Sequence, residues 1–220
     1  MKLIAIFGGT FDPVHRGHLE VANEVRRRLG CDALIFLIAG SPPLRDTPSA
    51  TSEQRLEMLQ LALAEHPEFE VDARELTRSG KSYTVDTLEA LRGEMGYRDV
   101  ALAWILGADA YAVLPQWHRW RELLDLAHLV ILDRPGTHGE LPFALEDVAA
   151  RCSTPNAQEL RSEAAGRIYH LRQPPVAVSS TQIRKLISEG RSAEHLLPSS
   201  VWAYITGHGL YGWQPGRSDS

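Results

Sequence analysis

Short apolar runs recur along this chain, and most of them end at a glycine or in a polar turn. Runs of this kind are typical of parallel strands that are buried on both faces of a sheet. They lie at residues 3–7, 33–39, 69–72, 100–106, 128–133 and 167–171. The chain is therefore expected to build a largely buried sheet.

Amphipathic stretches separate these runs. Over residues 16–29 the apolar positions recur at helical spacing, and Gly30 is placed to close that helix. A second helix is expected with Ser52 as its N-cap. That helix covers about residues 53–63. Further helices are expected at about residues 83–95, 145–151 and 197–207. Strands and helices thus alternate along most of the chain.

This alternation predicts an α/β fold, a Rossmann-like doubly wound parallel sheet with a small C-terminal helical part at about residues 176–213. We expect residues 1–213 to form a single domain and residues 214–220 to be a flexible tail. Right-handed crossovers place the loops that follow parallel strands at one edge of the sheet, where ligands of such folds bind. Motifs in those loops are therefore the candidates for function.

The most informative loop follows the first strand and reads GGTFDPVHRGH from Gly8. A strand, a glycine turn and a helix start bind phosphate, because free N–H groups and the helix dipole point at the anion. Gly8 and Gly9 are expected to turn the backbone sharply, and Thr10 offers a hydroxyl. His15 and His18 lie about one helical turn apart, so both rings can face one pocket. Two alternatives are a metal-binding pair and helix caps without chemistry.

A second candidate reads SSTQIR, from Ser179 to Arg184. A helix that starts at Ser180 or Thr181 offers free N–H groups and hydroxyls, with an arginine one turn further on. This combination suits the phosphates of a nucleotide. The alternative is an ordinary serine or threonine cap beside an exposed arginine.

Two further stretches carry candidate ligand contacts. Ser82 to Thr87 reads SYTVDT and leads into a helix, so Ser82 or Thr84 could simply cap that helix. After the strand at 100–106, a turn from Gly107 is followed by Trp117 and Trp120. A tryptophan can stack on a flat heteroaromatic ring. The alternative is that both are core aromatics, which we favour for Trp120.

In their order along the chain, these four motifs resemble those of the nicotinate-nucleotide adenylyltransferases, members of the HxGH nucleotidyltransferase superfamily. The resemblance implies transfer of AMP from ATP to nicotinate mononucleotide, giving nicotinate adenine dinucleotide and pyrophosphate. It implies Mg²⁺ with ATP, held chiefly by phosphates and water, and no metal site on the protein. His15, His18 and Arg184 are the implied catalytic residues. Because a protonated imidazole stabilises phosphate charge better, we expect raised histidine pKa values in the nucleotide complex.

The resemblance also assigns binding residues. Contacts to ATP or phosphate are implied for Gly8, Gly9, Thr10, Phe11, Gly107, Asp109, Arg134, Ser179, Ser180 and Thr181. Contacts to nicotinate mononucleotide are implied for Arg45, Thr84, Trp117 and His118. Leu44 and Arg45 stand where the family usually has His and Lys, so any role of that histidine is missing here. Asp12 either lies near the metal or orders the loop through backbone hydrogen bonds.

Other functions remain open at this point. A nicotinamide-mononucleotide or phosphopantetheine adenylyltransferase, or a cytidylyltransferase, would share the motif from Thr10 to His18. The stretch at residues 82–87 and Trp117 favour the nicotinate enzyme. A catalytically silent nucleotide sensor is a more distant alternative. The sequence does not determine the oligomeric state.

Composition narrows the setting. The 220 residues carry a net charge of −5, which argues against a general nucleic-acid binder. Only two cysteines occur, Cys31 and Cys152, and they form no disulfide framework, so a reducing compartment is expected. No apolar run approaches the roughly 20 residues of a membrane span. The apolar run near the N-terminus is too short for the core and cleavage site of a signal peptide. We therefore expect a cytoplasmic protein with small-molecule partners.

Overall fold

The structure is a computed structural model that describes residues 1–41, 47–133, 142–172 and 178–214. Its strands form one sheet in the order β3-β2-β1-β4-β5-β7-β6, and every pairing is parallel. The strands are β1 (Leu3–Gly9), β2 (Ala33–Ile38), β3 (Phe69–Asp72), β4 (Ala101–Gly107), β5 (His128–Asp133), β6 (Ser153–Thr154) and β7 (Ile168–Arg172). The predicted doubly wound α/β fold is confirmed. The two-residue strand β6 was not predicted from the apolar pattern.

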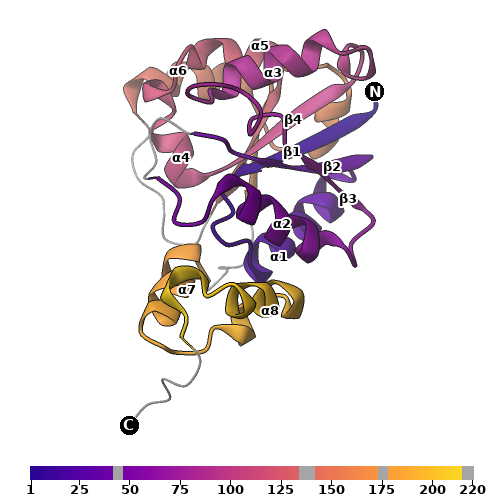
Figure 1. Cartoon of the computed structure of the whole chain (residues 1–220). Helices are drawn as coiled ribbons and strands as arrows, with labels where there is room; N and C mark the ends of the chain where they lie inside the picture. The colour runs from indigo at the N-terminus through magenta and orange to yellow at the C-terminus, as the bar shows by residue number, and fades with distance from the viewer. Residues whose placement is uncertain (42–46, 134–141, 173–177, 215–220) are drawn as a thin grey trace.

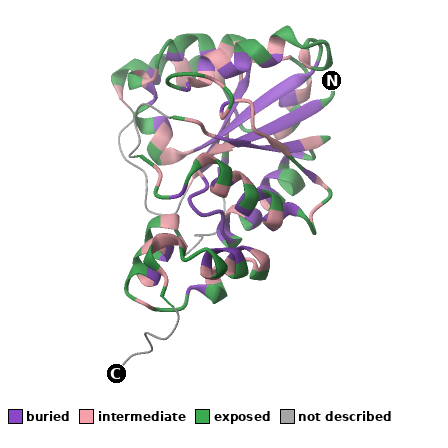
Figure 2. Ribbon diagram, viewed as in Figure 1, coloured by how far each residue is buried: buried purple, intermediate pink, exposed green. Residues whose placement is uncertain are grey.

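Helices cover both faces of this sheet, as Figure 1 shows. They are α1 (Arg16–Leu29), α2 (Ser52–Leu63), α3 (Thr84–Gly93), α4 (Ala108–Ala112), α5 (Leu123–Leu126), α6 (Phe143–Cys152), α7 (Ser180–Ser188) and α8 (Ser199–Gly207). In β1, Leu3, Ala5 and Phe7 pack toward α1 and α2, whereas Ile4 and Ile6 pack toward α3 and α5. Both faces of the central strands are therefore buried (Figure 2), which explains their uninterrupted apolar sequence.

The helix ends differ in part from the predictions. Gly30 closes α1 in the left-handed conformation, with φ 56°, as predicted. Thr51, not Ser52, caps α2: its hydroxyl accepts from the N–H of Gln54 at 3.3 Å, and the Gln54 side chain accepts from the N–H of Thr51 at 3.0 Å. This reciprocal pair satisfies two N–H groups that a serine cap one residue later would leave open.

The start of α3 also differs. Tyr83 occupies the N-cap position without a side-chain hydrogen bond, so neither Ser82 nor Thr84 caps this helix. Thr84 is instead the first residue of α3. The capping alternative for Thr84 is therefore wrong, and its hydroxyl is not used to start the helix.

The C-terminal helices α7 and α8 pack below α1 and α2 (Figure 1). Their apolar residues Ile183, Ile187, Val201 and Ile205 belong to the same buried cluster as Leu3 and the inner face of α1. The Ser200 hydroxyl donates to the Leu61 carbonyl of α2 at 3.1 Å. A shared core thus holds the segment from Ser179 to Arg184 against the first part of the chain.

No helix in the part of the chain that the structure describes combines the length and the apolar character needed to cross a membrane. Cys31 is buried and Cys152 is half-buried, and both are free thiols. Burial raises the pKa of the Cys31 thiol to about 11, so it is protonated at neutral pH and unreactive.

Gly40, just beyond β2, offers a test of backbone packing at the ligand-binding edge. A Cβ atom there would lie 2.5 Å from the Glu75 carbonyl oxygen and 2.7 Å from the Ser82 hydroxyl. One of these contacts is with backbone, so the loop has to shift. We expect Gly40→Ala to lower the free energy of unfolding by about 1–3 kcal/mol, measured by urea denaturation.

The matched control is Gly107→Ala, also at the end of a strand. A Cβ at Gly107 would meet no atom within 4 Å in the described structure. We expect it to change stability by less than about 0.5 kcal/mol. Equal losses in the two variants would mean that the close approach at Gly40 is not what requires glycine.

Candidate active site

The site is built on the loop between β1 and α1. His15 is the N-cap of α1 and His18 lies in its first turn. The backbone N–H of His15 donates to Nδ1 of His18 at 3.2 Å, and the two rings stack with centroids 3.7 Å apart and an interplanar angle of 22°. Because Nδ1 of His18 accepts this bond, the proton of the neutral ring lies on Nε2. The hydrogen bond and the stacking therefore fix the two imidazole rings relative to each other at the start of α1.

His15 is the more buried of the pair, with 5% of its surface exposed. Its Nδ1 atom is buried and has no hydrogen-bond partner among the described residues. Burial lowers the pKa of His15 to about 4, because the charged imidazolium loses its hydration. In the free protein at neutral pH, His15 is therefore uncharged.

Gly8 and Gly9 act differently from the prediction. They are the last residues of β1 and pair with β2, and neither has a positive φ. The chain turns after them, at Phe11, whose φ is 49°. A Cβ at Gly8 would lie 2.8 Å from the Trp104 ring, and one at Gly9 would lie 2.7 Å from the Phe11 ring. The predicted glycine turn is wrong: glycine is needed here because aromatic rings pack directly on the backbone.

Asp12 orders the loop. Its carboxylate is only 4% exposed and accepts from the N–H of Ser49 at 2.7 Å and of Ala50 at 3.2 Å. The hydroxyl of Tyr211 donates to the same carboxylate at 2.8 Å. Both carboxylate oxygens are thus engaged within the protein, which favours the ordering role of Asp12 over a place near the metal.

Arg55 of α2 is a site residue that the sequence analysis missed. Its side chain is 1% exposed and its Nη1 donates to the carbonyls of Thr10 at 2.7 Å and Ala39 at 2.9 Å. Burial lowers its pKa, but an arginine remains charged. Arg55 lies one turn before Leu59, on the buried face of α2. A charged residue on an apolar helix face was the available signal.

The second motif lies directly against this loop. Ser179 caps α7, accepting from the N–H of Gln182 at 3.2 Å. The Ser180 hydroxyl donates to the Pro13 carbonyl at 2.9 Å, and Nη1 of Arg184 donates to the Asp12 carbonyl at 2.7 Å. Beside Arg184 is an open hollow of about 430 Å³, lined by Ser49, Thr181, Arg184, Lys185, Ser188 and Tyr211. Two motifs that are far apart in sequence therefore share one site.

A second group of predicted residues lies where α3 begins. The ring of Tyr83, just before Thr84, packs on the ring of His118 with centroids 4.5 Å apart. Trp117 is half-buried against the core under α3, and Trp120 is buried, as favoured for a core aromatic. The segment that contains Thr84 therefore lies beside the turn that contains Trp117 and His118.

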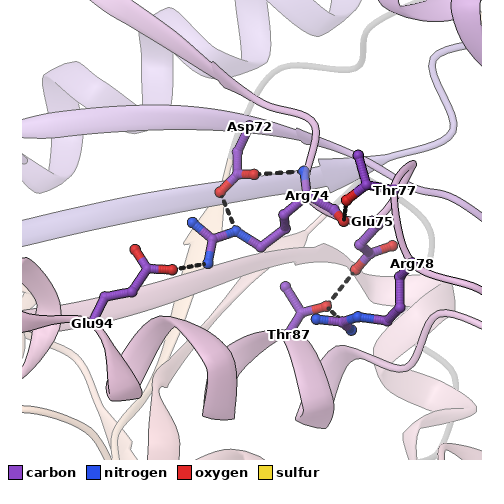
Figure 3. Close-up of polar contacts among 7 residues, drawn as sticks. All are labelled: Asp72, Arg74, Glu75, Thr77, Arg78, Thr87 and Glu94. Atoms are coloured by element: carbon purple, nitrogen blue, oxygen red, sulfur yellow. Dashed lines mark hydrogen bonds and ion pairs between the residues drawn. The ribbon is translucent and has the colours of Figure 1, made fainter.

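A buried carboxylate fixes the start of α3 relative to the end of β2. Glu75 accepts from the Thr87 hydroxyl at 2.7 Å and from the N–H of Gly40 at 3.2 Å. Arg78 donates to the same hydroxyl at 3.1 Å. Figure 3 shows this group beside the ion pairs of Arg74. The loop after β2 and the helix that begins at Thr84 are therefore held together.

The remaining predicted residues divide into two sets. Gly107 ends β4, and Asp109 lies in the first turn of α4, at the same sheet edge as the end of β1. Arg45 and Arg134, like Leu44, lie outside the described residues. In the described ranges, no group of three or more His, Cys, Asp or Glu side chains is arranged to hold a metal ion.

Comparison with known sequences identifies the family. Residues 6–186 match the cytidylyltransferase-like family. Over 208 residues, 94% of this chain and 96% of the relative, the sequence is 44% identical to an Aeromonas salmonicida protein named "probable nicotinate-nucleotide adenylyltransferase". A Pseudomonas aeruginosa protein of the same name is 45% identical over 210 residues, 96% of this chain and 97% of the relative. The chain belongs to the nicotinate-nucleotide adenylyltransferase family.

A solved structure agrees in fold. The nicotinic acid mononucleotide adenylyltransferase of Plasmodium falciparum, in complex with NaAD, superposes with a TM-score of 0.73 at 16% identity, covering 97% of this chain and 99% of that one. At this identity the likeness concerns the fold alone. As a nicotinate-nucleotide adenylyltransferase, the chain is a nucleotidyltransferase of NAD biosynthesis, as its motifs predicted.

The buried histidine makes the stability of this adenylyltransferase depend on pH. The pKa of His15 is about 4 when folded and about 6.5 when unfolded, so the unfolded chain binds a proton that the folded one excludes. Stability is therefore lost as the pH falls from about 6.5 toward 4. Between pH 7.5 and 5, wild type should lose about 2 kcal/mol more than His15→Asn, measured by urea denaturation at each pH. Parallel losses in the two proteins would contradict the burial of a neutral His15.

Proposed function

We propose that this adenylyltransferase transfers AMP from ATP to nicotinate mononucleotide at the junction of the β1–α1 loop and α7. The main support is the direct contact of the two phosphate-binding motifs, in which Arg184 and Ser180 donate to carbonyls of the Asp12–Pro13 segment. This contact gathers a helix start, two imidazoles and a guanidinium. Such a set of donors fits a polyphosphate.

In the proposed reaction, the phosphate oxygen of nicotinate mononucleotide attacks the α-phosphorus of ATP. The new bond joins that oxygen to the α-phosphorus, and the bond from the α-phosphorus to the bridging oxygen breaks, releasing pyrophosphate. The protein supplies no nucleophile. Its contribution is to align the reacting groups and to stabilise charge on the phosphate oxygens.

His15 and His18 carry much of this stabilisation. The Nε2–H of His18 is a donor, because its Nδ1 atom is occupied by the His15 N–H. His15 is neutral before ATP binds, and a phosphate beside it favours the charged ring. We therefore expect ATP to raise the pKa of His15, which adds a positive charge where the α-phosphate reacts.

Mg²⁺ bound to ATP would neutralise part of the polyphosphate charge. Phosphate oxygens and water are its main ligands in this proposal, since Asp12 uses both of its oxygens within the protein. Contacts to ATP or its phosphates are assigned by their motifs to Gly8, Gly9, Thr10, Phe11, Gly107, Asp109, Ser179, Ser180 and Thr181. Arg134 is assigned to phosphate by its motif alone. The reaction is assigned to the cytoplasm.

Nicotinate mononucleotide is assigned to the segments around the start of α3. The half-buried ring of Trp117 is suited to stack on the pyridine ring, and Thr84 and His118 lie on segments joined by the packing of Tyr83 on His118. Arg45 is assigned to the mononucleotide phosphate by its motif alone. The network of Glu75 fixes the position of this half of the site relative to the strands.

The direct test is pyrophosphate release with ATP and Mg²⁺, comparing three acceptors. We expect strong preference for nicotinate mononucleotide over nicotinamide mononucleotide and phosphopantetheine, because relatives 44% and 45% identical are named nicotinate-nucleotide adenylyltransferases. Preference for another acceptor would retain the phosphate machinery and reject the assigned mononucleotide half. Absence of release with all three would favour a nucleotide sensor.

A substitution tests the imidazole role. We expect His18→Ala to lower kcat by on the order of a hundredfold or more, because it removes a donor to the transition-state phosphate. His66→Ala is the matched control, since His66 pairs with Glu68 away from the loop. Circular dichroism should show both variants folded. Full turnover by His18→Ala would reject a catalytic His18.

A further inference from the structure

The phosphate loop is tied to the far end of the chain. The hydroxyl of Tyr211 donates to Oδ1 of Asp12 at 2.8 Å, across a sequence separation of 199 residues. Tyr211 lies in a short 3₁₀ turn, η6 (Leu210–Gly212), and has φ 58°, a conformation that residues with side chains rarely adopt. Gly209 and Gly212, with φ 59° and 80°, flank it. This backbone presents the tyrosine ring to the loop.

Asp12 joins this turn to the residues assigned to catalysis. Its carbonyl accepts from Arg184, and its carboxylate lies 3.8 Å from the same guanidinium. Three residues later the chain reaches His15. The backbone position of Asp12 therefore bears on the position of Arg184 relative to the histidine pair.

Tyr211 is suited to hold this carboxylate. Burial and the adjacent Asp12 raise the pKa of the tyrosine, so its hydroxyl stays protonated and remains a donor at neutral pH. Ser49 and Ala50 also donate to Asp12, but they do so from backbone N–H groups on the α2 side. Among the described donors to this carboxylate, Tyr211 alone comes from the C-terminal helical part.

We propose that Tyr211 is a positioning residue for adenylyl transfer: through Asp12, its hydroxyl aligns Arg184 with the histidine pair. This inference rests on the proposed function for its kinetic consequence. The inference also states that the hydroxyl sets the geometry of the loop, and this statement can be tested in the free protein without an activity assay.

The chain offers a matched control. In α8, the hydroxyl of Tyr204 donates to a carboxylate of Glu57 in α2 at 3.0 Å. This bond joins the C-terminal helices to α2, whereas the bond of Tyr211 joins them to the loop between β1 and α1. Tyr204→Phe therefore removes the same kind of bond from the same part of the molecule.

The experiment compares Tyr211→Phe with Tyr204→Phe, well below their melting temperatures. Both keep the ring, so we expect both to fold, with the Tm lowered by a few degrees. Only Tyr211→Phe should lower kcat, by on the order of tenfold to a hundredfold, because transfer depends on sub-ångström alignment. In the free protein, only Tyr211→Phe should shift the imidazole NMR signals of His15 and His18.

A double-variant cycle tests the route through Asp12. If Tyr211 acts through this carboxylate, adding Tyr211→Phe to Asp12→Asn should lower kcat little further. Wild-type kcat and unshifted histidine signals in Tyr211→Phe would overturn the inference, as would multiplicative losses in the double variant. If the wild type releases no pyrophosphate, the proposed function fails, and the histidine signals still decide whether Tyr211 positions the loop.

Discussion

The structure depends on the hydrogen bonding of two buried charged groups, Asp12 and Arg55, at the loop between β1 and α1. Asp12 and Arg55 are both removed from water, and an unpaired charge in such a place would cost several kcal/mol. Carbonyls just beyond β1 and β2 accept from Arg55, and the Asp12 carboxylate accepts from N–H groups of the loop before α2 and from the hydroxyl of the C-terminal turn. The sheet edge, α2, α7 and the last turn therefore have to assemble together around one loop.

This arrangement explains how a protein with a net charge of −5 can receive a polyphosphate. Arg184 donates to the segment that leads into α1, so its guanidinium lies beside the loop before that helix. His15 is kept neutral by burial, so the free site is not burdened with another unpaired buried charge. Under the proposed function, a phosphate beside His15 would supply the counter-charge that favours the protonated ring.

Much of the fold could be predicted from the sequence, because buried parallel strands leave uninterrupted apolar runs and Gly30 marks a helix end. The clustering of the motifs followed from the topology of parallel strands. Arg55 could have been suspected as a charged residue on an apolar helix face, but the partners of Arg55 and Tyr211 could not be predicted, because their bonds to the loop span 45 and 199 residues. Gly8 and Gly9 were recognised as necessary, but the reason lies in Trp104 and Phe11, whose rings come to them through tertiary packing.

The bond between Tyr211 and Asp12 has a consequence for synthesis on the ribosome. A chain emerges from its N-terminus, so Asp12 leaves the tunnel 199 residues before the hydroxyl that completes its hydrogen bonds. The sheet has its strands by Arg172, well before that point. At translation rates of about 5–20 residues per second, the nascent protein spends about 10 to 40 seconds with the loop translated and its last donor still missing. The strands of the sheet are thus translated before the bond between Tyr211 and Asp12 can form.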